Sequence, residues 1–312
     1  MFDMADKSSI KIFVLIILLF VNITSCRSYV EDLPYFEAVP VVNSFLIAGK
    51  PITISVSYAD LPDTLGIRVC DNATVNLYID DSFAEMLVFD EDESVYVSDL
   101  TAEAEKYYAC EVIIPNYDTL FAETFVPKPS VIENPEIIVV AGIDNEGRSY
   151  PSVKFTFNTN PDDELYFHVV IKRIRLYDPS REYPLYNSLD PIILHEGLNY
   201  PVFSNEIIDE DFYTINLSYF TGSYGSATNP YSIGGTVVHP IFVELRSVSE
   251  DYYHFIKQYY LFNDYLESIG EIMTGPVQPV QMYSNVTNGY GVFAGLSVFV
   301  TDTIFPPGYT YN

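Results

Sequence analysis

The fold is decided by the stretch Ile52-Thr53-Ile54-Ser55-Val56-Ser57-Tyr58, in which apolar residues alternate with small polar ones. Successive side chains of a β-strand point to opposite faces, so this period of two predicts a strand with one buried face. Residues 74–79 repeat the pattern, and residues 107–114 and 119–126 are predicted as further strands. Short strands separated by turn residues are typical of an Ig-like antiparallel β-sandwich, which we expect over residues 41–130.

The Pro-rich stretch 127–135 marks the predicted boundary with a second β-rich domain, residues 131–312. In the apolar run 165–176 the alternation of inward-facing residues drifts near Lys172-Arg173, which predicts a β-bulge or a sharp twist there. Residues 177–203 are rich in Pro, Asn and Tyr and are predicted as an extended loop region. The other strands predicted in this half lie at residues 137–141, 153–157, 237–245 and 292–304.

One amphipathic α-helix is predicted in the second domain, at about residues 250–268. Ser249 can cap it, two acidic residues favour its first turn, and Gly270 ends it. The side predicted to pack against the sheet carries Tyr252, Phe255, Tyr259 and Leu266. The side predicted to face water carries His254, Lys257, Gln258 and Asp264.

The start of the chain has the pattern of a lipoprotein signal peptide. Lys7 and Lys11 precede an unbroken apolar run of ten residues, 12–21. As a helix this run would reach about 15 Å, against about 30 Å of hydrocarbon, which suits a signal peptide better than an uncleaved anchor. The residues Ile23-Thr24-Ser25 before Cys26 resemble a lipobox. We therefore expect residues 1–25 to be removed, lipid on Cys26 to anchor the protein to a membrane, and residues 26–40 to form a lipidated tether.

The strongly acidic composition excludes some partners. Acidic residues outnumber basic ones by 43 to 15, and the formal net charge is −28. Such a surface repels phosphate backbones and anionic lipid headgroups. We expect no nucleic-acid binding, and contact with a membrane only through the N-terminal lipid.

The remaining cysteines leave two alternatives open. Cys70 and Cys110 could form a disulfide in an oxidising compartment, or both could be buried free thiols, since Cys110 lies on the inward face of a predicted strand. Two cysteines and four scattered histidines do not make a zinc site. No metal, cofactor or catalytic residue is predicted.

Two short motifs have simpler explanations than ligand binding. Residues 289–294 fit the dinucleotide pattern G-x-G-x-x-A, but a polar turn precedes them and a β-like apolar run follows, where the motif needs a strand and then a helix. We expect Asn288-Gly289 to be a tight turn. The acidic run Asp90-Glu91-Asp92-Glu93 lacks the alternating ligands of a calcium loop and is predicted as a solvated hairpin tip.

Four segments, in their order along the chain, carry a family resemblance. They are the lipobox ending at Cys26, Val41-Val42-Asn43-Ser44-Phe45-Leu46 followed by Gly49-Lys50-Pro51-Ile52, Ala73-Thr74-Val75-Asn76-Leu77-Tyr78, and Tyr283-Ser284-Asn285-Val286-Thr287-Asn288-Gly289-Tyr290-Gly291-Val292-Phe293. The helix opening Glu250-Asp251-Tyr252-Tyr253-His254-Phe255 fits as well. Together they resemble the Bacteroidetes lipoprotein family named for domain of unknown function 4249.

This resemblance implies an outer-membrane lipoprotein that works beside a TonB-dependent uptake system, and it offers no catalytic residues to carry over. Surface-exposed lipoproteins of this phylum usually have acidic residues directly after the lipidated Cys. Here Glu31-Asp32 follows only after Arg27-Ser28-Tyr29-Val30, so the cell surface and the periplasmic side both stay open.

Three functions follow from these observations. The first is a non-enzymatic lipoprotein that binds or supports a TonB-dependent receptor. The second is a surface adhesin or glycan-binding module, favoured by 27 Tyr and 21 Phe, whose rings can stack on sugars, although Trp is absent. The third is an enzyme with an unfamiliar site, which the scattered histidines do not support.

Overall fold

The computed structural model describes residues 38–59, 67–173, 182–222, 232–233, 236–271 and 282–308. The predicted signal peptide, Cys26 and most of the predicted tether lie outside these residues. So do the side chains of Asp264 and Leu266, which the sequence places on opposite sides of the helix.

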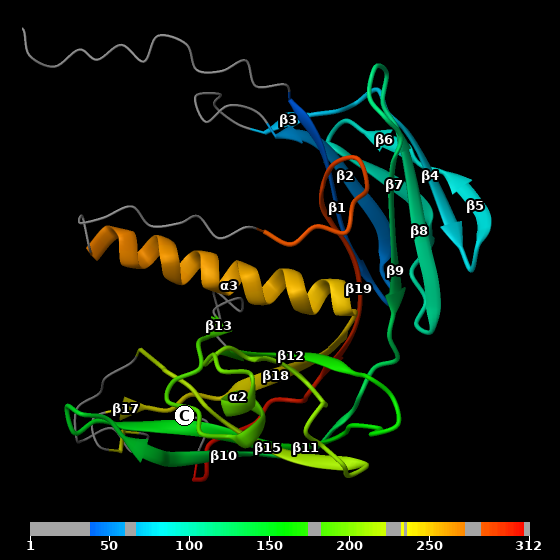
Figure 1. The fold of residues 1–312 in the computed structure, drawn as a ribbon. Coiled ribbons are helices and arrows are strands. Elements are labelled where there is room, and N and C mark those ends of the chain that lie inside the picture. Colours follow the sequence, from blue (N-terminus) through cyan, green and yellow to red (C-terminus); the bar gives the residue numbers. More distant parts are fainter. Residues whose placement is uncertain are drawn as a thin grey trace, which may run out of the picture. The chain divides into compact units, whose positions relative to one another are not determined.

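The protein is mainly β, as the sequence predicts, and its first half is a sandwich of two sheets (Figure 1). One sheet contains β1 (Val39–Ile47), β2 (Pro51–Ala59), β3 (Arg68–Val69), β6 (Val88–Asp90) and β7 (Val95–Thr101). The other has the order β5-β4-β8-β9 and contains β4 (Thr74–Ile79), β5 (Ser82–Met86), β8 (Lys106–Ile113) and β9 (Leu120–Val126). Every described pair within this half is antiparallel.

The alternating strands supply the core of this sandwich. Ile52, Ile54 and Val56 of β2 are fully buried, and they share one cluster with Val75 of β4 and Val112 of β8. Burying a side chain of this size contributes roughly 1.5–3 kcal/mol each. The apolar residues that alternate with a period of two in the sequence are therefore those that point into the sandwich from its two sheets.

The second half has its own core, which lies between a separate three-stranded sheet and further strands of the sheet that contains β1. Three strands form the sheet β10-β11-β15, which contains β10 (Ile132–Ile143), β11 (Ser149–Asn158) and β15 (Phe212–Ser218). Facing it through a shared core are β12 (Tyr166–Arg173), β13 (Glu182–Tyr183), β14 (Val202–Ser204) and β18 (Ile241–Val248). A separate two-stranded pair contains β16 (Ser232–Ile233) and β17 (Thr236–Val237).

Strand β19 (Tyr290–Val300) joins the two halves into one sheet of order β13-β12-β18-β19-β1-β2-β7-β6. It pairs antiparallel with β18 and parallel with β1, with Val41 opposite Tyr290 and Phe45 opposite Ala294. Two segments that carry the family resemblance, at opposite ends of the chain, therefore meet here. Asn43 Oδ1 also accepts a hydrogen bond of 3.1 Å from the backbone N–H of Val292.

The segment before β19 is tied to β9 by asparagine side chains. Asn285 Nδ2 donates to the carbonyl of Glu123 at 3.1 Å, and Asn288 Nδ2 donates to the carbonyl of Thr119 at 2.9 Å. Asn288 turns the chain with a φ of 61°, and β19 begins two residues later. The predicted tight turn is confirmed, and a strand rather than a helix follows the glycines.

The predicted bulge in β12 is wrong. Its register with β18 is unbroken from Tyr166 opposite Val248 to Arg173 opposite Ile241. The run is apolar on both faces because both are covered: Phe167 and Val169 enter the core of the second half, while His168 and Val170 are buried on the opposite face. A strand buried on both sides loses the alternation on which the sequence argument depended.

The region predicted as an extended loop contains a short helix, α2 (Pro191–His195). Asp190 caps it, since its carboxylate accepts a hydrogen bond of 3.2 Å from the backbone N–H of Ile192. Pro191 occupies the first turn, where a missing N–H costs nothing. These cap signals are present in the sequence, but five residues are too few to show a helical period.

Helix α3 (Glu250–Glu271) begins where predicted, with Ser249 Oγ accepting from the backbone N–H of Tyr252. Tyr252 is buried and Phe255 is half-buried, as expected. Two expectations about its sides are wrong: Tyr259 is 43% exposed, and Lys257 is bound to Glu196 at 2.7 Å instead of facing water. The buried side of the helix includes Tyr253 instead of Tyr259, because the loop that carries Glu196 packs against Tyr253.

Candidate functional site

A cavity of about 550 Å³ opens where the edge of β12 changes partners. Strand β14 pairs with β12 at residues 166–168, and β13 pairs with it at Ile171 and Lys172. Between the two, the Val169 N–H donates to the carbonyl of Pro201. We call this cavity the Tyr260 pocket; its lining residues are Val169, Val170, Ile171, Glu182, Tyr183, Pro184, Leu185, Gly197, Leu198, Asn199, Tyr200, Pro201 and Tyr260.

Three tyrosines, Tyr183, Tyr200 and Tyr260, are among the residues that line the Tyr260 pocket. Tyr200 and Tyr260 stack with their ring centroids 4.9 Å apart and their planes 18° apart. Tyr183 stacks on Tyr219 at 5.3 Å, and both of these rings are buried. Rings held in pairs lose little further freedom when a ligand binds, so the wall is preorganised.

A buried histidine fixes the position of Tyr260. His168 of β12 is 3% exposed, and each of its ring nitrogens meets a hydroxyl of helix α3. Nδ1 lies 2.9 Å from the Tyr252 hydroxyl, and Nε2 lies 3.1 Å from the Tyr260 hydroxyl. Burial, and then the charges of Arg246 and Lys172, lower the pKa of His168 from 6.5 to about 3. The imidazole is therefore neutral at physiological pH.

The hydrogen-bond network assigns the tautomer of this neutral ring. Arg246 Nη1 donates to the Tyr252 hydroxyl oxygen at 3.3 Å, and a guanidinium can only donate. The Tyr252 oxygen could accept a second hydrogen bond, but its own proton has Nδ1 of His168 as an acceptor at 2.9 Å, which favours the tautomer with the ring proton on Nε2. In that tautomer Nε2 donates to the Tyr260 hydroxyl. The chain of donors runs from Arg246 through Tyr252 and His168 to the wall of the pocket.

The charged residues behind the pocket are paired with one another. Glu244 accepts from Lys172 Nζ at 2.6 Å and from Arg246 Nη2 at 2.7 Å. Burial alone would raise the pKa of Glu244, but these two cations outweigh it and hold the pKa below its ordinary value. Lys172 also lies 3.9 Å from Glu182, whose side chain is 52% exposed and lines the pocket.

A second polar cluster ties the loop after α2 to helix α3. The buried carboxylate of Glu196 accepts from Lys257 Nζ and from the Tyr253 hydroxyl, both at 2.7 Å, and from the Ser204 N–H. Burial would raise the pKa of Glu196, but these donors outweigh it and the pKa is lowered. The cluster holds both ends of residues 196–204, which include five residues that line the pocket.

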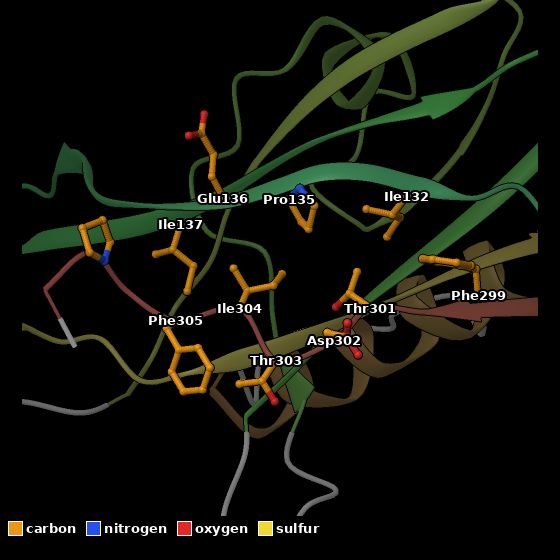
Figure 2. A pocket seen from close by; sticks show the side chains of 11 residues that line it. Ile132, Pro135, Glu136, Ile137, Phe299, Thr301, Asp302, Thr303, Ile304 and Phe305 are labelled. Atoms are coloured by element: carbon orange, nitrogen blue, oxygen red, sulfur yellow. The ribbon is translucent and has the colours of Figure 1, made fainter. Parts of the chain in front are cut away.

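A more open cavity of about 470 Å³ lies between edge strand β10 and the chain after β19. Figure 2 shows Ile137 and Ile304 facing one another across it, while Glu136 points away. Thr301 and Ile304 continue the pairing with β18, which holds this wall in place. Its lining carries the carboxylates of Glu136 and Asp302 but no tyrosine, whereas the lining of the Tyr260 pocket includes three tyrosines, so the Tyr260 pocket is the more aromatic of the two.

The two cysteines are both described as free buried thiols, so the possible disulfide is not present. Cys70 Sγ lies 3.3 Å from the Tyr58 hydroxyl and 3.4 Å from Asn72 Oδ1, which directs it to these polar partners. Cys110 lies on β8 in the core of the first sandwich, where burial raises the pKa of its thiol from 9.0 to about 12.

The other sites that the sequence raised are structural. The acidic run 90–93 forms the predicted hairpin tip between β6 and β7, where Asp90 Oδ1 accepts from the backbone N–H groups of Asp92 and Glu93. His239 is half-buried and its Nδ1 lies 3.2 Å from Arg173 Nη2. Among the described residues, no group of three or more His, Cys, Asp or Glu could hold a metal ion.

Sequence reasoning missed the residues of the Tyr260 pocket. One signal was available: Glu244 and Arg246 alternate with the buried residues of β18 and give its second face a charged pattern. His168 lies directly opposite Arg246 on β12. The contacts of His168 and Arg246 with Tyr252 and Tyr260 depend on how helix α3 packs on the sheet, and no local sequence pattern predicts that packing.

The chain matches a family model over residues 27–302, described as a domain of unknown function (DUF4249). This protein belongs to that family. The matched range contains both sandwiches, helix α3 and all of β19. No curated protein and no solved structure matches the chain. Within the part of the chain that the structure describes, no helix has the length and apolar content needed to cross a membrane.

Proposed function

We propose that this DUF4249 protein is a non-enzymatic lipoprotein of the outer membrane that serves as a binding or accessory module for a TonB-dependent transport partner. Lipid on Cys26 anchors it, and the Tyr260 pocket is its small-molecule site. The anchor rests on the sequence around Cys26, and the partner rests on the family resemblance.

The observation that carries the binding role is the state of His168. A general base needs a pKa near the working pH and an unoccupied nitrogen within reach of its substrate. His168 has a pKa of about 3, both ring nitrogens are occupied, and the side chain is 3% exposed. These properties suit a group that positions Tyr260 for binding and do not suit proton transfer.

The anchor is tested by metabolic labelling with a radioactive fatty acid. Cys26→Ala should abolish the label and leave only uncleaved precursor in the membrane, whereas Cys70→Ala should be labelled like the natural chain. Equal label in the Cys26 variant and the natural chain would contradict the lipid anchor.

The partner is tested by purifying the lipidated protein from its own outer membrane in mild detergent and identifying what accompanies it by mass spectrometry. A TonB-dependent receptor should be enriched relative to a parallel purification of an unrelated lipoprotein. A preparation without such a receptor would contradict the transport role.

A glycan-binding or adhesin role is the second candidate, favoured by aromatic side chains on the outer face of the β5-β4-β8-β9 sheet. Phe83 and Tyr107 are 59% and 65% exposed, and they form ring pairs with Tyr78 and Phe125. Binding to a glycan array that is lost in Tyr107→Ala would favour this role over the first.

A further inference from the structure

We propose that the Tyr260 pocket binds an organic cation, namely an ammonium group that carries apolar substituents. This inference deepens the proposed function, on whose binding role it rests, by naming the class of ligand.

The charge of the lining favours a cation. Glu182 is the only charged side chain among the lining residues, and it is half exposed. Lys172 Nζ lies 3.9 Å from the Glu182 carboxylate but only 2.6 Å from Glu244. Glu182 is therefore loosely paired, and it is the lining residue that can attract a positive charge.

The aromatic lining favours the same ligand. Tyr183, Tyr200 and Tyr260 all contribute to the wall. The face of an aromatic ring is negative, and it attracts a cation held within about 6 Å of the ring centroid. Apolar substituents on the ammonium group would contact Val170 and Leu185, which lie in the same wall.

The network places a neutral ring, and not a positive charge, behind Tyr260. A protonated His168 would place a positive charge 3.1 Å from the Tyr260 hydroxyl, but the ring is neutral. Arg246 is turned to Glu244 and to the Tyr252 hydroxyl. The hydrogen bond from Nε2 of His168 holds Tyr260 in place, so little ordering remains to be done on binding.

The whole chain adds to this preference. Its formal net charge of −28 creates a negative potential that raises the local concentration of cations and speeds their association. An anion would be repelled both by this potential and by Glu182. A neutral apolar ligand would remove water from the Glu182 carboxylate without replacing its hydrogen bonds, which is unfavourable.

The test compares choline with 3,3-dimethylbutan-1-ol, which has the same shape and no charge. Isothermal titration calorimetry on the full lipidated chain in detergent should show choline binding at least about tenfold more tightly, since ring attraction and the carboxylate both act on the charge. Equal affinity for the two, or no binding of choline, would overturn the proposal.

Three variants locate the site. Glu182→Gln and Tyr200→Leu should each weaken choline binding by about fivefold or more, because each removes one attraction to the charge. Glu136→Gln, an exposed carboxylate outside the pocket, should bind choline like the natural chain. Thermal unfolding of each variant checks that the fold is kept, and an unchanged affinity in well-folded Glu182→Gln would refute the role of this carboxylate.

The two proposals fail in different experiments. If the receptor accompanies the lipidated protein but choline does not bind, the ligand class is wrong and the module role stands. If choline binds and loses affinity in Glu182→Gln but no receptor is found, the ligand class stands and the transport role is wrong.

Discussion

Nδ1 of His168 lies 2.9 Å from the Tyr252 hydroxyl, although the two residues are 84 positions apart in the chain. This contact joins strand β12 to helix α3. Because Tyr252 also accepts from Arg246, it orders the whole series of donors that ends at Tyr260. The helix is therefore held to the sheet by buried polar contacts as well as by its apolar side chains.

Tyr252→Phe should lower the free energy of unfolding by about 1–3 kcal/mol, because it leaves the buried Nδ1 of His168 without its partner. Urea titration followed by circular dichroism measures this. Tyr259→Phe is the matched control: Tyr259 belongs to the same helix but is 43% exposed, so its change should stay within about 0.5 kcal/mol. Equal losses in the two variants would show that the hydroxyl of Tyr252 is not the cause.

His168 should make stability depend on pH in a definite direction. Its pKa is about 3 in the folded chain and 6.5 when unperturbed, so below pH 6.5 the unfolded state takes up a proton that the folded state refuses. Stability is complete above the unfolded pKa and falls as the pH is lowered toward 3, with a slope that approaches about 1.4 kcal/mol per pH unit.

The measurement compares urea unfolding at about pH 6 and pH 5, which lies above the ordinary pKa of about 4.3 for Glu. His168→Gln cannot titrate and should lose this part of the slope, whereas His254→Gln, at an exposed position, should keep it. An unchanged slope in His168→Gln would mean that other groups cause the pH dependence.

Lys257→Ala should lower the free energy of unfolding by about 1–3 kcal/mol. The sequence predicted Lys257 on the water-facing side of the helix, where its loss would have little effect. Removing Lys257 leaves the carboxylate of Glu196 buried with one fewer donor. Lys154→Ala is the control, because its pair with Glu136 is exposed on both sides and such pairs contribute about 0–1 kcal/mol. Chemical denaturation of both variants decides the matter; similar small losses would show that the Glu196 cluster adds little.

Alternation predicted the burial of strands that have one buried face, such as β2 and β4. Strand β19 was predicted from its apolar run, although it is buried on both faces. Alternation failed at β12 because helix α3 covers its second face. The start of α3 could be predicted from its cap, but the direction of its buried side could not, since Glu196 comes from a loop 61 residues away from Lys257. Local patterns report which residues are apolar, and they do not report which distant segment covers them.

The candidate site shows the same limit more strongly. Tyr260 lies on the predicted helix but outside its predicted buried stripe. Its partners His168 and Tyr200 come from strand β12 and from the loop before β14. The parallel pairing of β1 with β19 was equally beyond local patterns, because residues 249 positions apart form its contacts. The sequence shows which residue types are present in these segments. It does not show which of them come together, because that depends on pairing between distant strands.

Gly291→Ala should be strongly destabilising. Gly291 has a φ of 116°, and a Cβ at this position would overlap the carbonyl oxygen of Val42 on the paired strand. Strain of this kind costs of order 1–3 kcal/mol, and the overlap would add to it by pushing β19 from β1. Gly49→Ala is the control, since Gly49 also has a positive φ but open space around it, so only about 1 kcal/mol should be lost. Thermal unfolding that ranks the two variants equally would argue against close packing at the β1–β19 pair.

The state of Cys70 and Cys110 can be tested by counting thiols in the Cys26→Ala variant, in which they are the only cysteines. Both are 1% exposed, and the pKa of Cys110 is raised to about 12 by burial, so the thiolate needed for reaction is scarce. A thiol reagent such as DTNB should therefore react with neither residue in the folded protein. After unfolding in guanidinium without a reductant, it should react with both, and Cys70→Ala should lower the count to one. Thiols that become available only after a reductant is added would instead establish a disulfide between Cys70 and Cys110, and the free-thiol arrangement would be wrong.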